Sequence, residues 1–127
     1  TTSVGVLDPV PDGTPPAQPI DEQPSATGLM SVGFCDPNSP SNPAVTLAWV
    51  PEGSGAQLLA ISTLPDGFET GRYTVTGEMA AGNAMYEISP IEPGGIYYWR
   101  LLTRSGDRWL SSLQESFTGP ICVLDSP

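Results

Sequence analysis

The chain has 127 residues and a net charge of −10 at pH 7, with fourteen acidic residues, four arginines and neither lysine nor histidine. Its length fits one domain with a buried core, while its negative charge and scarcity of cations exclude binding to nucleic-acid phosphates and to anionic lipid surfaces. No apolar run approaches the ~20 residues of a spanning helix, so we expect no nucleic-acid partner and no membrane insertion.

The first predicted element is a proline-rich extended tail over residues 1–27, which holds six of the fifteen prolines. Such a composition favours a polyproline-like segment without a core of its own. The first seven residues, TTSVGVL, differ because they are rich in β-branched side chains and favour a strand. Val4, Val6 and Leu7 are therefore candidate contacts to another subunit.

The second predicted unit, residues 28–127, is an all-β sandwich. Its short runs of alternating apolar and polar residues are separated by clusters of Gly, Pro, Asn and Asp, which are typical of turns. No window has an apolar period of 3.6, so we expect no helix longer than one turn. Seven short strands at regular spacing predict a sandwich or barrel. The predicted strands are 29–34, 44–50, 57–63, 72–76, 84–89, 95–104 and 108–118.

The second and sixth predicted strands carry large side chains at alternate positions. Val45 and Trp49 share one face of the second strand, and Tyr97 and Trp99 share one face of the sixth. Because successive side chains of a strand point to opposite faces, one face of each strand can enter a shared core.

A tight turn, IEPGGIY, precedes the sixth strand. Pro93 presets φ, and Gly94 or Gly95 can take a positive φ. The hydroxyl of Tyr97 can then bond back across the corner between the two sheets.

This corner, of the form aliphatic-x-Pro-Gly-x-x-Tyr, follows a Leu-x-Trp at Leu47 and Trp49, and together the two motifs resemble a fibronectin type III domain. The resemblance extends from residue 27 to residue 120, and it departs from the family in the long 36–43 connection and in a cysteine pair. It implies a seven-stranded immunoglobulin-like β-sandwich. The core and tyrosine corner that it implies are Trp49, Ile91, Pro93, Gly94, Tyr97 and Trp99.

The only two cysteines are Cys35 and Cys122. We interpret them as one long-range disulfide formed in an oxidising compartment, with two separate buried thiols as the alternative. In a seven-strand up-and-down arrangement the first and seventh strands run in the same direction. Their C-terminal ends then lie at the same pole, which favours the disulfide.

Catalytic chemistry finds little support in this composition. A nucleophilic serine or cysteine needs a base, and both histidine and lysine are missing. The acidic residues lie mostly in predicted turns or in the tail, as on a solvated surface. Oxygen-rich stretches at 8–12 and 36–42 lack the glycine and terminal glutamate of a calcium loop. We therefore expect no enzyme, no catalytic residue, no metal and no cofactor.

Two aromatic side chains, Tyr98 and Trp109, are predicted to be exposed. Arg100, Arg104 and Arg108 lie near them on adjacent predicted strands. The rings could form a platform for carbohydrate, or the arginines could simply stack on them and stabilise the surface.

Two functions fit these observations. The first is a non-enzymatic structural subunit of a secreted, extracellular or cell-surface assembly, filament-like, whose tail joins neighbouring subunits by strand addition. Fully extended, the tail reaches on the order of 90 Å, so it can cross onto a neighbour or fold back on its own domain. The alternative is a binding or spacer module of a larger secreted carbohydrate-active enzyme or cell-adhesion protein. A chain beginning with Thr fits a mature secreted protein, and equally a fragment.

Overall fold

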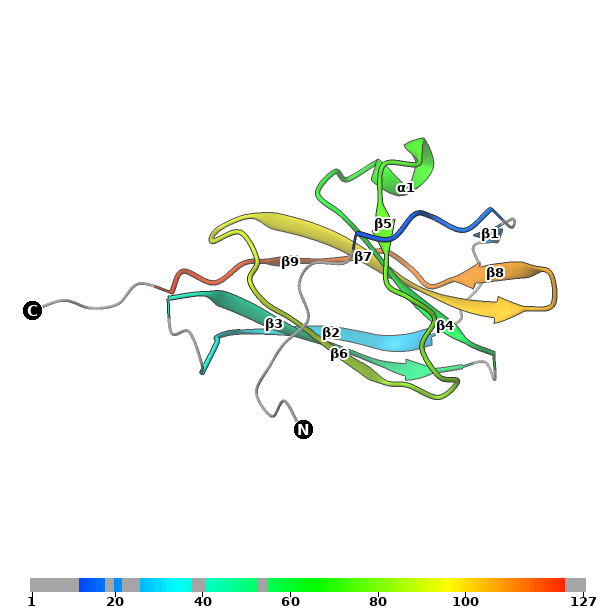
Figure 1. Cartoon of the computed structure of the whole chain (residues 1–127), viewed down its shortest axis with the longest axis horizontal. Coiled ribbons are helices and arrows are strands. Elements are labelled where there is room, and N and C mark those ends of the chain that lie inside the picture. Colours follow the sequence, from blue (N-terminus) through cyan, green and yellow to red (C-terminus); the bar gives the residue numbers. More distant parts are fainter. Residues whose placement is uncertain (1–11, 18–19, 22–25, 38–40, 53–54, 123–127) are drawn as a thin grey trace, which may run out of the picture.

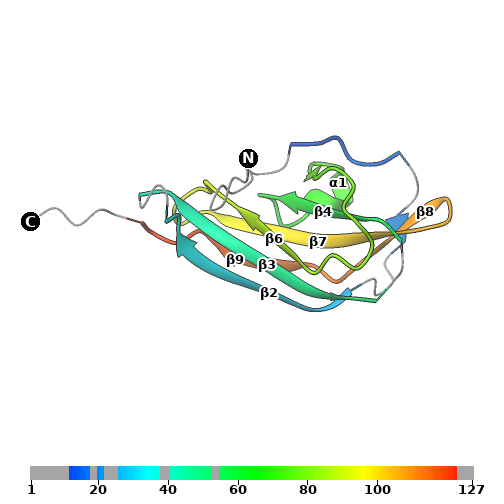
Figure 2. The ribbon, with the colours of Figure 1, turned by 60° about the horizontal axis from the view of Figure 1, so that its bottom comes forward.

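The computed structural model describes residues 12–17, 20–21, 26–37, 41–52 and 55–122. Within them the chain forms two layers of β-sheet and a single helical turn (Figures 1 and 2), which confirms the predicted all-β sandwich. The elements are β1 Ile20–Asp21, β2 Ala26–Cys35, β3 Pro43–Pro51, β4 Gln57–Ser62, α1 Gly67–Thr70, β5 Thr74–Val75, β6 Met85–Ile88, β7 Ile96–Ser105, β8 Arg108–Ser111 and β9 Glu115–Thr118.

The smaller sheet has the order β2-β3-β6, and all of its pairs are antiparallel. Its central strand β3 alternates as the sequence predicts, because Val45, Leu47 and Trp49 are buried while Thr46 and Ala48 face the other side. One face of this sheet therefore lies on the core.

The larger sheet has the order β1-β8-β7-β4-β5, and β9 also pairs with β7. The long strand β7 binds β8 along its second half and β9 along its first half. The predicted strand 108–118 is thus divided in two. At the division three residues, 112–114, stand opposite only Arg100 and Leu101. This arrangement is a β-bulge, and its middle residue Leu113 is turned out into solvent.

The main core lies between the two sheets. Trp49 from the smaller sheet and Trp99 from the larger one meet with ring centroids 6.1 Å apart. The Trp49 indole N–H donates to the Asn83 carbonyl at 2.7 Å, so its polar group is satisfied. The buried members of this core are Ala26, Val45, Leu47, Trp49, Leu59, Ile61, Ile88, Ile91, Tyr97, Trp99, Leu101 and Phe117.

A second apolar cluster lies on the outward face of the larger sheet. Every residue of β4 is buried, because this outward face is covered as well as the inward one. The covering residues are Ile20 of the tail, Phe68 of α1 and Tyr73. The sheet residues beneath them are Leu58, Ala60, Val75, Leu102 and Trp109.

The structure corrects the predicted exposure of Trp109, whose ring is only 1% exposed. Strand β1 runs alongside β8, with Ile20 opposite Trp109, and the Arg104 guanidinium lies over the indole at 5.6 Å. The arginine stacking weighed above for this ring is therefore present. Tyr98 is half-buried.

Candidate interaction site

Cys35 and Cys122 form a disulfide, with their Cα atoms 5.7 Å apart and 87 positions separating them in the sequence. The bond joins the end of β2 to the segment that follows β9. Gly33 assists this approach, because a Cβ there would lie 3.3 Å from Pro120. The edges of the two sheets are therefore held together on the β2 and β9 side of the sandwich.

The turn before β7 has the geometry of a tyrosine corner. Tyr97 is buried and stacks on Phe117 with centroids 5.1 Å apart. Its hydroxyl oxygen accepts a hydrogen bond from the Glu92 main-chain N–H at 2.7 Å. Gly94 has a φ of 72°, the left-handed conformation that glycine adopts without strain. Pro93, between Glu92 and Gly94 in the turn, is exposed.

The tail is attached to its own domain at two places. At the first, Gly13 and Val75 exchange two main-chain hydrogen bonds of 2.9 and 3.0 Å. This bridge adds one residue of the tail to the free side of β5. Only glycine fits there, because a Cβ on Gly13 would lie 2.5 Å from the Val75 carbonyl oxygen.

The second attachment is β1, which pairs in parallel with β8. An ion pair between Asp21 and Arg108 holds it. The hydrogen bond to Asp21 raises the pKa of Arg108 above its ordinary value, with the charge of the same carboxylate as a further cause. Ile20 adds apolar contact with the cluster around Trp109.

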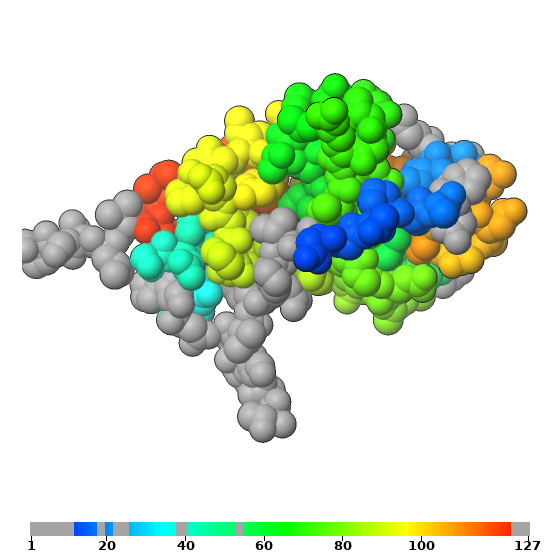
Figure 3. Space-filling view, turned by 45° about the horizontal axis from the view of Figure 1, so that its top comes forward, coloured from blue at the N-terminus to red at the C-terminus, as the bar shows by residue number. Residues whose placement is uncertain are grey.

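Residues 12–17 lie over the outward face of the larger sheet (Figure 1), and Figure 3 shows them as a band of blue atoms on the surface of the molecule. From the added position beside β5 to that beside β8 there are five inter-strand steps, or about 24 Å. The seven steps from Gly13 to Ile20 span at most about 25 Å. The chain between Gly13 and Ile20 therefore has just enough length to join the two attachments.

In the part of the chain that the structure describes, no strand pairs with the outer edge of β6 in the smaller sheet. Antiparallel pairing alternates, and Trp49 N–H donates to the Ala84 carbonyl at 3.1 Å. The main-chain groups of Met85 and Glu87 consequently face away from β3. The Met85 carbonyl accepts from the Asn83 side chain at 2.9 Å. Among the described residues, no hydrogen bond is made by the main-chain N–H of Met85 or by the N–H and C=O of Glu87.

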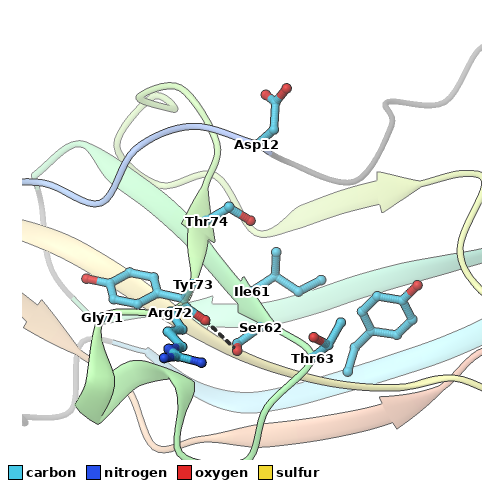
Figure 4. A pocket seen from close by; sticks show the side chains of 9 residues that line it. Asp12, Ile61, Ser62, Thr63, Gly71, Arg72, Tyr73 and Thr74 are labelled. Carbon is cyan, nitrogen blue, oxygen red and sulfur yellow. Dashed lines mark hydrogen bonds between the residues drawn. The ribbon is translucent and has the colours of Figure 1, made fainter.

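A pocket of about 500 Å³ lies beside β5, where the tail arrives at the sheet. Asp12 stands over it, and Thr63, Arg72 and Thr74 lie around it (Figure 4). The Ser62 hydroxyl donates to the Arg72 carbonyl at 2.8 Å, so it is already used within the protein. The pocket is open, and its lining combines polar side chains with a larger share of apolar surface, with buried Ile61 at its floor.

The three predicted subunit contacts, Val4, Val6 and Leu7, lie outside the described residues. Over the ranges that the structure does describe, no group of three or more His, Cys, Asp or Glu side chains is arranged to hold a metal ion. The same ranges contain no helix long and apolar enough to cross a membrane.

The sequence left open whether the tail folds back on its own domain or crosses to a neighbour, and it did not indicate which residues attach it. Gly13, Ile20 and Asp21 attach it, and none of them was singled out. Ile20 carried the one usable signal, because it is a large aliphatic residue in an otherwise proline-rich and polar stretch.

Comparisons with known proteins support the fold. No protein-family model matches the chain, and no curated protein sequence matches it. Among solved structures, it is similar to a computationally redesigned β-sandwich protein, with a TM-score of 0.60, 14% identity, and coverage of 83% of this chain and 97% of the other. It is also similar to a fibronectin type III domain of the human KIAA0970 protein, with a TM-score of 0.57, 16% identity, and coverage of 81% and 78%. The chain has a fibronectin type III-like β-sandwich fold.

Proposed function

We propose that this fibronectin type III-like sandwich is a non-catalytic structural subunit of an extracellular, filament-like assembly, and that its N-terminal strand TTSVGVL adds to the β6 edge of a neighbouring subunit. The observation that carries the proposal is the attachment of residues 12–21 to their own sheet, together with the open edge of β6. The tail is anchored where Gly13 meets β5, and TTSVGVL precedes that anchor in the sequence. A disulfide fits an extracellular location.

Other edges are less suited to accept a strand. The β5 edge is taken by Gly13 and the β8 edge by β1. The end of β2 is tied by the disulfide to the segment after β9, and Gly33 of β2 lies close to Pro120. On β6, three outward main-chain groups make no hydrogen bond within the described residues. Each hydrogen bond formed there is worth about 0.5–1.5 kcal/mol net. Side-chain burial at Val4 and Val6 would add to this.

Reach alone does not choose between the two possible acceptors. Eleven extended residues span about 36 Å, so the strand could reach a neighbour's β6 or its own. A neighbour's edge allows assembly to propagate from subunit to subunit, because each molecule both donates a strand and presents an edge.

The test uses the full chain in two variants, Val6→Cys and Glu87→Cys, each with one cysteine added to the native Cys35–Cys122 pair, mixed under mild oxidation. A disulfide between the two different molecules, seen on a non-reducing gel and mapped by mass spectrometry, is the expected result. The matched control replaces Glu87→Cys by Thr118→Cys, an exposed position on β9. The Thr118→Cys variant should give little cross-linked product.

Sedimentation provides a second readout. Val4→Asp/Val6→Asp should reduce the wild-type assembly to smaller species, because it places charge where the strand would be buried. Thr1→Asp/Ser3→Asp adds the same charge on the opposite face of the strand and should act more weakly. The assembly proposal would be overturned if the wild type sedimented as a monomer. It would also be overturned if a Val6→Cys/Glu87→Cys double variant formed the cross-link only within one molecule.

The pocket beside β5 favours a second candidate, a binding module of a larger secreted protein. Its volume of about 500 Å³ lies within the range of small-molecule sites. Its lining offers charged side chains and the tyrosines Tyr73 and Tyr97 beside apolar surface, a combination that suits sugar rings with their hydroxyl groups. Chemical-shift changes at Thr63 and Arg72 on titration with a panel of soluble oligosaccharides would support this candidate, and unchanged spectra at millimolar sugar would remove it.

A further inference from the structure

The outward face of the smaller sheet is apolar and uncovered. Met30, Val32, Val50 and Met85 are 58%, 58%, 56% and 53% exposed. Strand pairing sets Met30 opposite Ala48, and Ala48 opposite Met85. These residues therefore form one continuous patch over all three strands, which we call the β2-β3-β6 face.

The two outward faces of the sandwich differ in this respect. The larger sheet carries apolar residues outside as well, but the tail and α1 cover them. Among the described residues, nothing covers the β2-β3-β6 face, and four aliphatic or thioether side chains each leave more than half of their surface in water. Contiguous apolar patches of this kind mark interaction surfaces, and methionines adapt well to a partner's shape.

Two carboxylates border the central row of this face, because Glu52 follows the end of β3 and Glu87 lies opposite Thr46, one row from Ala48. The Glu52 carboxylate accepts a hydrogen bond from the Thr27 hydroxyl at 2.9 Å, and the Glu87 carboxylate accepts one from the Thr46 hydroxyl at 3.0 Å. The central row around Ala48 carries no charge. A partner can therefore cover the centre without burying an unpaired ion.

We propose that the β2-β3-β6 face binds the same face of a second copy of this chain. A two-fold axis through Ala48, running across the strands, places the central row of one copy on the central row of the other. The small side chain of Ala48 lets the sheets approach there, with Met30 over Met30 and Met85 over Met85. The two Glu87 carboxylates lie on opposite sides of the axis and do not face each other. This contact does not depend on the N-terminal strand.

The size of the face indicates a weak contact. Three strands about 4.8 Å apart, followed over the nine residues of β3, give at most about 400 Å², because β6 pairs with only four of those residues. Stable complexes bury about 800 Å² on each partner. The face supplies at most about half of that area, so we expect a monomer–dimer equilibrium that becomes visible only at high protein concentration.

The salt dependence of association distinguishes a second copy of this chain from a basic partner. Each copy carries a net charge of −10, so two copies repel one another at long range. Added salt screens that repulsion, because the Debye length falls from about 10 Å at 0.1 M to about 3 Å at 1 M. Self-association through an apolar face should therefore strengthen with salt, whereas binding of a cationic partner would weaken.

The experiment is sedimentation velocity on the full chain carrying Val4→Asp/Val6→Asp, which blocks strand addition, from about 10 μM to about 1 mM protein. We expect the weight-average sedimentation coefficient to rise with concentration and to rise further in 1 M NaCl. Met30→Glu/Met85→Glu in the same background should weaken association at least tenfold.

The matched control is Ile96→Glu/Leu113→Glu, which makes the same chemical change at residues 53% and 76% exposed elsewhere on the surface. It should shift association less than twofold. A sedimentation coefficient independent of concentration would overturn the proposal, and so would equal effects of the two variant pairs or weakening by salt. The proposed function would still stand if the native chain assembled through its tail while the β2-β3-β6 face showed no self-association. The failure of one proposal can therefore be told from the failure of the other.

Discussion

Substitution of Tyr97 by Phe removes one oxygen atom from the tyrosine corner and leaves the rest in place. The Phe ring can still stack on Phe117, since that contact of 5.1 Å involves only the rings. The Glu92 N–H loses its acceptor at 2.7 Å. Because Tyr97 is buried while Glu92 is exposed, this hydrogen bond is part-buried, and the unpaired main-chain donor is reached by water only in part.

An unsatisfied buried donor costs about 1–3 kcal/mol. The entropy of unfolding is about 2.1 cal/mol/K per residue, which for 127 residues makes each kcal/mol worth roughly 4 °C in Tm. Tyr97→Phe should therefore lower Tm by roughly 4–12 °C. Its urea midpoint should fall without a change in the slope m, since the surface exposed on unfolding is the same.

The matched control is Tyr98→Phe, the same chemical change one position along on the opposite face of β7. Tyr98 is half-buried and outside the corner, so its loss of a hydroxyl should change Tm by less than about 2 °C. Thermal and urea denaturation followed by circular dichroism decide the question. Equal Tm values for Tyr97→Phe and wild type would refute the assignment of the Glu92–Tyr97 bond as a stabilising contact.

Three further predictions concern the disulfide, the tail and a buried tyrosine. Reducing Cys35–Cys122, which closes a separation of 87 residues, should cost about 4.5 kcal/mol on the loop-entropy model; a loss below about 1 kcal/mol on denaturation with reductant would contradict that model. Gly13→Ala should break the bridge to β5 and speed hydrogen exchange of the Val75 amide at least tenfold, while the Thr76 amide, bonded to Leu59, keeps its rate; unchanged exchange at Val75 would show that the bridge is not formed. Burial raises the pKa of Tyr73 above its ordinary 10.0, against an opposing effect of Arg100. The unfolded chain therefore releases this proton first, so stability should fall as pH rises above about 10; Tyr73→Phe should flatten that decline in urea midpoints, and an identical decline in both proteins would exclude Tyr73 as its source.

The strands and their inward faces could be predicted because a period of two decides which residues share a face. Leu47 and Trp49 on β3, and Trp99 on β7, point inward as the alternation requires. The bulge at 112–114 could not be predicted in this way. The bulge exists only where β8 and β9 pair with β7. Without β7 as a partner, the alternation from 108 to 118 predicts a single strand.

What covers each face was beyond the sequence. The period-two alternation places Trp109 on the outward face, and nothing in its own strand indicates that Ile20 lies over it. The bridge at Gly13 uses main-chain groups, which every residue has, so it leaves no side-chain pattern. The ion pair of Asp21 with Arg108 is one choice among fourteen acidic residues and four arginines.

The disulfide between Cys35 and Cys122 has a mechanical consequence. Tension applied between a point before Cys35 and a point after Cys122 passes through the bond between the two sulfurs. Residues 36–121 then lie on a closed covalent loop that carries almost none of the force. Only β1, β2 and the tail attachments can be peeled away, so a pulled molecule should lengthen by the chain before residue 35 and stop. Reduction would release the loop, and a further 86 residues or so would become extensible, roughly 280 Å of contour length.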